Sequence, residues 1–346
     1  MKRLPSWFLF MIAVAIFSAA PKVYAQSEFI TRHMPYDAFD KLPATIVKVE
    51  GGTLLVAFAP GTLTLPNTSF ISWIAKSARA VSIYYGRFPV PSARILLVPV
   101  EGKGVSGGKA FGYKGAAVRL LIGRDSTETD LVEDWQAVHE MIHLALPEVG
   151  DQHLWLSEGL AVYVESIARV QAGDLTEAKI WGEFVRDMPQ GLPEAADKGL
   201  DHTPSWGRTY WGGALFCLLA DVEFRKRTAN SKGVQEATRG VLASGGNMER
   251  DWPIEQVFYI ADNAAGVPVL MELYEKMRAS PAPTDLGALW RDLGISVRDG
   301  VVTFDDEAPL SGIRRAITQA PGAAKSSLTS SGTTELNGRG EAPAQH

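Results

Sequence analysis

The chain has 346 residues, of which 46% are hydrophobic and 21% charged, and its formal net charge at pH 7 is −5. A chain of this length can bury a sizeable core in one or two domains. The mildly acidic balance argues against nucleic acid as a partner, because the basic run at 225–227 is short and typical of a helix end.

The N-terminus has the features of a secretory signal peptide. Lys2 and Arg3 precede an apolar run over residues 7–20, and residues 23–25 resemble a small-x-small cleavage site. This pattern predicts a signal peptide over residues 1–25, and the alternative is an uncleaved membrane anchor. We therefore expect an exported bacterial protein, periplasmic or extracellular, that contacts a membrane at most through an uncleaved signal segment.

The next stretch, residues 26–146, is predicted to form a β-rich subdomain. Its segment 45–58 alternates partly between apolar and polar residues around Gly51-Gly52, which predicts a β-hairpin with a two-residue turn. A helix to about Tyr85, a strand at 94–100 and a strand at 116–122 are expected to follow. The Gly-rich segment 102–115, between the two strands, matches no phosphate-binding pattern.

A helix is predicted to end this subdomain. Asp130 is a suitable N-cap, with Glu133 three residues later as in a capping box. Apolar residues then recur at helical spacing as far as Leu146, and Pro147 follows as a stop signal.

This helix carries the sequence His-Glu-Met-Ile-His at residues 139–143. A separation of four residues places His139 and His143 on one helical face, where two imidazoles can bind one Zn²⁺. Glu140 stands beside that face, close enough to act as general base on a metal-activated water.

A second apolar-periodic helix, residues 154–168, supplies the predicted third zinc ligand, Glu158. The loop between the helices is short, so we expect them to pack as antiparallel neighbours and bring Glu158 towards the two histidines. Glu165 lies two turns further along the same face and is predicted to accept a hydrogen bond from a ligand imidazole. The alternative is a solvated face with an ordinary helix glutamate, but a Glu within an apolar helix favours the metal site.

These motifs resemble those of a known family. Residues 154–165 look like the second zinc motif of the gluzincin metallopeptidases, which include alanyl-type aminopeptidases and the glycyl-aminopeptidase-like family. The resemblance extends over residues 110–315, and residues 210–215 are similar to the Tyr-x-x-Gly helix of those families. It implies that Tyr210 donates a hydrogen bond to the tetrahedral intermediate; from the residues alone, Tyr210 could equally be a core-edge aromatic.

The chain also departs from the family pattern. The spacer between His143 and Glu158 is shorter than in alanyl-type aminopeptidases, and the Gly-x-Met-Glu-Asn motif, whose Glu binds a substrate amine, is missing. The corresponding stretch, residues 107–115, has no carboxylate. Aminopeptidase and endopeptidase activity therefore both stay open. By analogy with thermolysin-like folds, this stretch is either a substrate-binding edge or a flexible hairpin tip.

Two further histidines and the single cysteine are less suited to the site. His202 is a rival oxyanion donor, because some thermolysin-like enzymes use a His, or a loop residue without a role. The distance of His153 from His143 does not fit the pattern with a third histidine ligand, which favours Glu158. Cys217, the single cysteine, is expected to be a buried, inert thiol.

The resemblance implies an α+β, thermolysin-like zincin catalytic domain: a small mixed sheet, then the zinc helix pair and a helical C-terminal lobe. We expect the helical subdomain over residues 147–318, with a long helix at 206–227 and a short strand or turn at 300–304. The segment 319–346 is rich in Ser, Thr, Gly and Ala, which predicts a disordered tail.

The resulting hypothesis is an exported, zinc-dependent metallopeptidase that hydrolyses peptide bonds in peptide or protein substrates. Two His and one Glu on helices favour zinc as the metal. One alternative is a catalytically silent module that binds peptides or an envelope partner, although such a module has no need of Glu140. The other is a metal-free structural envelope protein, against which the full ligand set argues.

Overall fold

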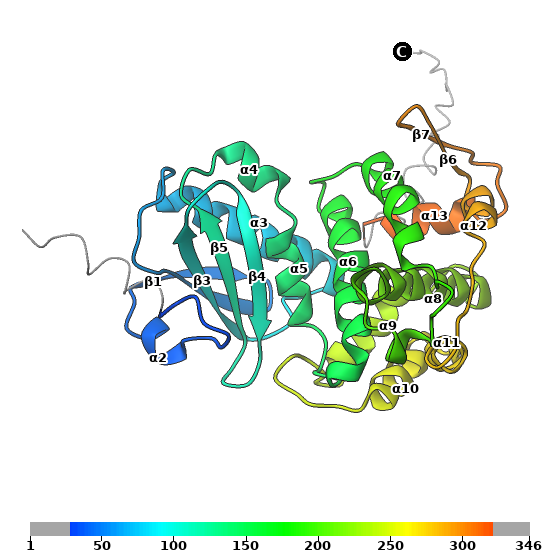
Figure 1. Ribbon diagram of the computed structural model, residues 1–346, viewed down its shortest axis with the longest axis horizontal. Coiled ribbons are helices and arrows are strands. Elements are labelled where there is room, and N and C mark those ends of the chain that lie inside the picture. The colour runs from blue at the N-terminus through cyan, green and yellow to red at the C-terminus, as the bar shows by residue number, and fades with distance from the viewer. Residues whose placement is uncertain (1–27, 321–346) are drawn as a thin grey trace, which may run out of the picture.

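The computed structural model describes residues 28–320, and its elements fall into two parts (Figure 1). Residues 28–146, here called the sheet lobe, contain a five-stranded sheet, and residues 147–320, the helical lobe, are mainly helical. The predicted signal peptide and nearly all of the predicted tail lie outside the described residues. Between residues 28 and 320, no helix is both long and apolar enough to cross a membrane.

The sheet is mixed, with parallel strands in its middle and antiparallel strands at both edges. Its strands are β1 (Ala44–Val49), β2 (Gly52–Phe58), β3 (Ser92–Val100), β4 (Val105–Phe111) and β5 (Ala117–Gly123). In space they follow the order β1-β2-β3-β5-β4, in which β2, β3 and β5 are parallel. The inner strands β3 and β5 are almost entirely buried, as expected for parallel strands covered on both faces.

The predicted hairpin at 45–58 forms, but its turn lies one residue earlier than expected. Val49 pairs with Gly52, so Glu50 and Gly51 make the turn. Gly51 adopts a φ of +79°, which a side chain would strain. Gly52 instead begins the strand, where a Cβ would approach the Val90 carbonyl oxygen to 2.7 Å. The two glycines therefore serve different purposes.

The middle of the Gly-rich segment forms an edge strand of the sheet. Within it, β4 pairs antiparallel with β5, and the register shifts between Val105 and Gly107. Among the described residues, no strand pairs with the outer edge of β4. The outer edge of β4 thus pairs with no strand of residues 28–320, although the Val105 carbonyl oxygen accepts from Gln136 and the main chain of Ala110 hydrogen-bonds Glu140.

Different elements cover the two faces of the sheet. Helices α3 (Asn67–Tyr85) and α5 (Gln136–His143) pack on one face, and the N-terminal segment with α2 (Tyr36–Phe39) covers the other. Alternation along β3 follows this division: Ile95 and Leu97 join the larger core, whereas Leu96 and Val98 join the smaller one.

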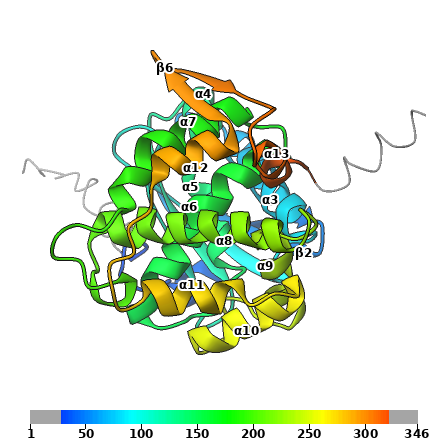
Figure 2. The ribbon, with the colours of Figure 1, turned by 90° about the vertical axis from the view of Figure 1, so that its right-hand side faces the viewer.

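The helical lobe is built around two long helices that cross closely. They are α6 (Leu154–Gln171) and α8 (Gly213–Arg227), and Figure 2 shows α8 crossing in front of α6. The remaining helices are α7 (Glu177–Asp187), α9 (Val234–Ala243), α10 (Ile254–Ala265), α11 (Val269–Met277), α12 (Leu286–Leu293) and α13 (Ser311–Thr318). The predicted strand or turn at 300–304 is the second half of a hairpin, β6 (Ile295–Arg298) with β7 (Val301–Phe304).

Two glycines allow α6 and α8 to approach until their main chains touch. A Cβ on Gly159 would lie 2.2 Å from the carbonyl carbon of Gly213. A Cβ on Gly213 would lie 1.9 Å from the carbonyl oxygen of Trp155. Since real Cβ atoms do not approach main-chain atoms so closely, both positions require glycine at this crossing.

Candidate metal centre

The helix with the two histidines begins later than predicted. Asp130 is not its N-cap: its carboxylate accepts hydrogen bonds from the main-chain N–H and hydroxyl of Thr127, both at 2.7 Å. Thr127 caps a separate short helix, α4 (Glu128–Glu133). The chain is extended at Asp134, whose carboxylate accepts a 3.0 Å hydrogen bond from the N–H of Ala137 in the first turn of α5. The predicted single helix is therefore two helices with a break at Asp134.

Helix α5 is short and buried, and its two histidines face α6. Its apolar side chains join the core, while His139, Glu140 and His143 are 4%, 9% and 6% exposed. Such burial of three polar side chains in eight residues is costly unless partners are present.

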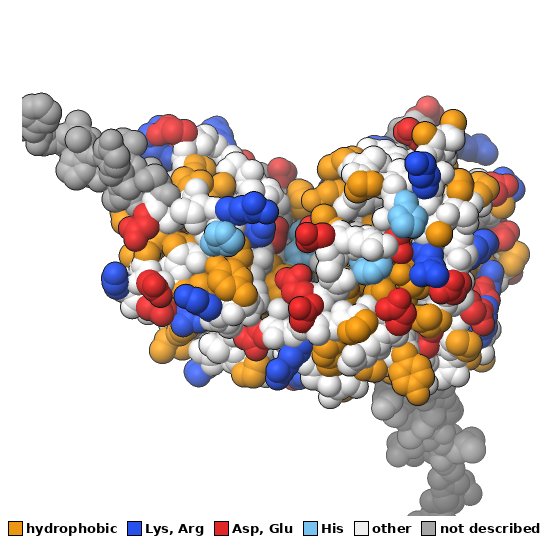
Figure 3. Space-filling view, turned by 60° about the horizontal axis from the view of Figure 1, so that its bottom comes forward, with side chains coloured by type: hydrophobic (Ala, Val, Ile, Leu, Met, Phe, Trp, Pro, Cys, Tyr) orange, Lys and Arg blue, Asp and Glu red, His pale blue; other side chains and the backbone are white. Residues whose placement is uncertain are grey.

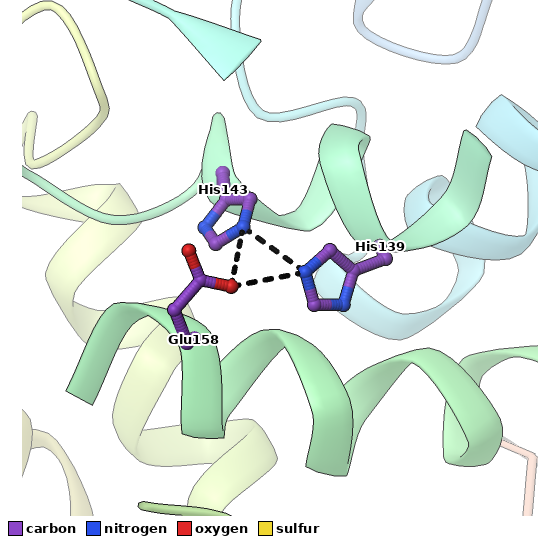
Figure 4. A group of neighbouring side chains, drawn as sticks. All are labelled: His139, His143 and Glu158. Carbon is purple, nitrogen blue, oxygen red and sulfur yellow. Dashed lines mark hydrogen bonds and ion pairs between the residues drawn. The ribbon is translucent and has the colours of Figure 1, made fainter. Parts of the chain in front are cut away.

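Three ligand atoms converge between α5 and α6 (Figure 4). The Nε2 atoms of His139 and His143 lie 3.2 Å apart. Oε2 of Glu158 lies 3.2 Å from His139 Nε2 and 3.5 Å from His143 Nε2. All three lone-pair donors therefore point at one place from two helices, as the sequence predicts.

The chemistry and spacing of these donors fit a zinc ion. Zinc takes imidazole nitrogen and carboxylate oxygen at about 2.0–2.1 Å in a tetrahedral arrangement, so its ligand atoms are about 3.3 Å apart. The separations of 3.2 to 3.5 Å agree with that value. A shared cation would also balance a carboxylate that no lysine or arginine of residues 28–320 neutralises at hydrogen-bonding distance.

The partners of the ligand residues differ from the prediction. His143 Nδ1 lies 3.0 Å from the hydroxyl of Ser157, and His139 Nδ1 has no partner among the described residues. Glu165 does not accept from an imidazole: its carboxylate takes hydrogen bonds from Arg169 at 2.7 Å and from Ser166 at 3.0 Å. Arg169, one turn further along α6, forms an ion pair with Glu165. Ser157, the residue before Glu158, forms the hydrogen bond with His143 instead.

The pKa values of the three ligand residues reflect their contacts. Burial lowers the pKa of His139, since the charged imidazolium loses hydration. Burial also disfavours charge on His143, but its hydrogen bond to Glu158 and the negative charges of Glu158, Glu140 and Glu148 together outweigh burial and raise its pKa. Burial alone would raise the pKa of Glu158, yet hydrogen bonds from both imidazoles hold it well below its usual range. Glu158 is thus an ionised carboxylate, as a metal ligand requires.

Glu140 lies between the histidine helix and the edge strand β4. Burial raises its pKa to about 7, although the charge of His143 and a hydrogen bond to the main chain of Ala110 oppose the shift. A Cβ on Gly108 would come within 2.5 Å of Glu140 Cγ, so glycine at this place in β4 leaves room for the carboxylate. A carboxylate with a pKa near 7 is suited to accept and return a proton at neutral pH.

Tyr210 lies beside the centre, on an irregular turn. Residues Arg208–Gly212 form a π-helix before α8, a feature frequent at functional sites. The Tyr210 side chain is partly buried, and burial together with the charges of Glu158 and Glu140 raises its pKa to about 12. It therefore remains protonated at neutral pH and can donate a hydrogen bond. A buried ion pair of 2.7 Å between Arg208 and Asp197 anchors the turn.

The remaining candidates lie away from the ligand atoms. His153 Nδ1 is 3.0 Å from Asp201, which also accepts hydrogen bonds from Trp155 and Tyr274. His202 is exposed at the end of the short 3₁₀ turn Leu200–His202, which also contains Asp201. Cys217 is buried in α8, and burial raises the pKa of its thiol, as expected for an inert cysteine.

The surface is hollowed between the two lobes, and a histidine side chain is visible within the hollow (Figure 3). Beyond β4, a pocket of about 490 Å³ is lined by residues 109–113 of the sheet lobe and 248–251 of the helical lobe. This pocket lies between the two lobes beside β4, and none of the three ligand residues lines it.

Comparison with known proteins supports the fold. No protein-family profile and no curated protein matches the sequence. Among solved structures, an aminopeptidase N family protein from Idiomarina loihiensis superposes with a TM-score of 0.57 at 15% identity, over 78% of this chain and 53% of the other. An M1 zinc metallopeptidase from Deinococcus radiodurans gives a TM-score of 0.46 at 16% identity, over 70% and 52%. The chain thus has the fold of the aminopeptidase N family protein, and it spans about half the length of both structures.

Proposed function

We propose that the chain is an exported, zinc-dependent peptidase with a thermolysin-like catalytic domain. The observation that carries this proposal is the convergence of His139, His143 and Glu158 at zinc-ligand spacing, with Glu140 buried beside them. The structure that shares the fold at a TM-score of 0.57 is described as an aminopeptidase N family protein, which supports a peptidase assignment. Export rests on the signal-peptide pattern of residues 1–25.

Each site residue has a role in peptide hydrolysis under this proposal. Zinc, held by His139, His143 and Glu158, would supply a Lewis acid that activates water and polarises the scissile carbonyl. Glu140 accepts a proton from the attacking water at its carboxylate and passes it to the leaving amine nitrogen. The Tyr210 hydroxyl donates a hydrogen bond to the oxyanion that develops on the carbonyl oxygen.

The free edge of β4 gives the substrate a place to bind. An extended peptide can add a strand there through main-chain hydrogen bonds, and Gly107 and Gly108 present no side chains to obstruct it. Because Gly108 contacts Glu140, a peptide in this position would pass directly in front of the proposed base. We infer that the substrate is a peptide or an extended protein segment.

The proposal is tested by replacing the base while the ligands are kept. Glu140→Gln preserves size and hydrogen bonding but cannot accept the proton, so we expect kcat to fall by about 10²–10⁴-fold. Zinc content, measured by plasma mass spectrometry on the purified protein, should stay near that of the wild type. Cleavage would be followed by mass spectrometry of a mixed peptide library.

Two results would contradict the proposal. Full turnover by Glu140→Gln would remove the base assignment. A wild-type protein that binds zinc but cleaves no peptide in the library would favour the catalytically silent peptide-binding module instead.

A further inference from the structure

Two exposed tryptophans flank the candidate centre. Within residues 28–320, most indoles are buried or partly buried, but Trp135 is 49% exposed and Trp206 is 60% exposed. Each makes a ring contact with a residue of the site. Exposure of so large an apolar side chain beside a functional group is typical of a binding surface.

Trp135 belongs to the sheet lobe. It occupies the break between α4 and α5, and its ring meets that of His139 edge-on, with centroids 5.2 Å apart. Since His139 is buried and Trp135 is half exposed, part of the indole packs against the His139 imidazole and the rest faces solvent. The neighbouring Gln136 fixes this turn by donating a 2.5 Å hydrogen bond to the Val105 carbonyl oxygen in β4.

Trp206 belongs to the helical lobe. Its ring stacks on Tyr210, with centroids 5.7 Å apart and an angle of 28° between the ring planes. Tyr210 in turn is close enough to Glu158 and Glu140 for their charges to affect it. Trp206 is thus separated from the centre by one aromatic ring, as Trp135 is, but approaches it from the other lobe.

We propose that Trp135 and Trp206 form apolar walls that select peptides with a large aromatic or aliphatic side chain next to the scissile bond. This inference rests on the proposed function. A side chain of a peptide bound along β4 would leave water by packing against an indole that the fold otherwise leaves exposed. Aromatic pairs gain further from stacked and edge-to-face geometries, which the two indoles already adopt toward His139 and Tyr210.

The occupant we favour is a peptide, because the free edge of β4 ends near the same residues. Gln136 joins the turn of Trp135 to this strand, and Gly108 of the strand contacts Glu140. A ring-shaped ligand without a peptide backbone could stack on an indole but could not add a strand to the edge of β4.

Binding and cleavage are measured separately, so that the selectivity can be tested without turnover. The zinc-loaded Glu140→Gln protein is titrated, by isothermal calorimetry, with blocked peptides that differ only in having Phe, Leu or Ala beside the central peptide bond. We expect Phe and Leu peptides to bind about tenfold or more tightly than Ala peptides. Adding Trp135→Ala or Trp206→Ala should reduce that ratio severalfold, and Trp206→Phe should restore most of it.

Tyr259→Ala is the matched control, because Tyr259 is an aromatic residue 66% exposed on α10, a helix that carries none of the site residues. It should leave the ratio unchanged. Zinc content and the melting temperature of each variant show whether the ligands and the fold survive.

Several outcomes would overturn the selectivity proposal. They are an unchanged ratio in both tryptophan variants, an equal loss in Tyr259→Ala, or a Trp-dependent affinity for chitooligosaccharides without any peptide preference. A preserved binding preference in a protein whose wild type cleaves nothing would instead remove the peptidase function and keep the selectivity. Peptide cleavage without any preference for Phe or Leu would keep the peptidase function and remove the selectivity.

Discussion

Helix α6 contributes to two buried polar clusters, and they differ in whether the protein balances their charges. Toward α8, Asp221 accepts hydrogen bonds from Tyr163 at 2.9 Å and from Arg225 at 2.8 Å. Toward α5, Glu158 meets the Nε2 atoms of two imidazoles. The first cluster contains its own cation, whereas the second has three donors of lone pairs around one point.

The same residue spacing serves both clusters. Asp221 and Arg225 are four residues apart on α8, as His139 and His143 are on α5. Two oppositely charged side chains four residues apart form an ion pair within one helix. Two imidazoles at the same spacing supply two of the ligands of a metal ion. The cluster around Asp221 is balanced by the protein's own charges and stabilises the fold. The cluster around Glu158 needs a bound cation to balance it and is the candidate functional site.

Removal of a ligand residue should give the largest effect. His139→Ala deletes one of three ligands, so we expect zinc to fall from about one ion per chain to near zero and peptide cleavage to disappear. Zinc content is read by plasma mass spectrometry after dialysis. If His139→Ala kept its zinc, the cluster around Glu158 would not be the metal site.

Disruption of the self-balanced cluster should act on stability and not on metal. Asp221→Ala leaves Arg225 buried without its partner, and we expect the free energy of unfolding to fall by about 3–5 kcal/mol. Urea unfolding of the zinc-loaded protein measures this loss, with Asp221→Asn as a milder variant if the first does not fold. A normal zinc content in the folded variant would sharpen the distinction; loss of zinc without loss of stability would reverse it.

Each cluster has a nearby tyrosine, and removing its hydroxyl group tests the role of that cluster. Tyr210→Phe removes the proposed oxyanion donor, so kcat should fall about 10²-fold with little change in zinc content. Tyr163→Phe removes a hydrogen bond to Asp221, so the protein should lose about 1–2 kcal/mol of stability and keep its kcat. Steady-state kinetics and urea unfolding on both variants would show whether the effects separate. An unchanged kcat in Tyr210→Phe would make Tyr210 a packing residue.

The smallest effect is expected from a methyl group beside the base. Gly108→Ala places a Cβ against Glu140, whereas at Gly107 the nearest atom is Leu121 Cδ1 at 3.6 Å. We expect kcat to drop about tenfold or more in Gly108→Ala, because displacement of a reacting group by a fraction of an ångström is costly, and to stay normal in Gly107→Ala. Equal kinetics in the two variants would mean that Glu140 tolerates the shift.

The sequence predicts the ligand set because its information is local. The spacing of four residues places His139 and His143 on one face of a helix. A short connection then brings the next helix, with Glu158, alongside them. The sequence also predicts the hairpin and the strands near 94–100 and 116–122, because alternation and turn residues act over a few positions.

What the sequence could not reveal depends on tertiary contacts. The break at Asp134 arises because Thr127 caps α4 and Asp134 caps α5, two competing solutions that look alike in the sequence. Glu165 lies on the expected face, but Arg169 reaches it before an imidazole can. The π-turn at Tyr210 immediately precedes the crossing of α6 and α8, which no local pattern encodes.

The close crossing at Gly159 and Gly213 has a consequence for protein engineering. Main-chain atoms make the contact, so no side chain there can be enlarged or trimmed to alter how the helix of Glu158 meets the turn of Tyr210. A randomised library should return only glycine at both crossing positions. The indoles at the rim carry no such restriction, so new substrate preferences can be evolved there while the catalytic spacing stays constant.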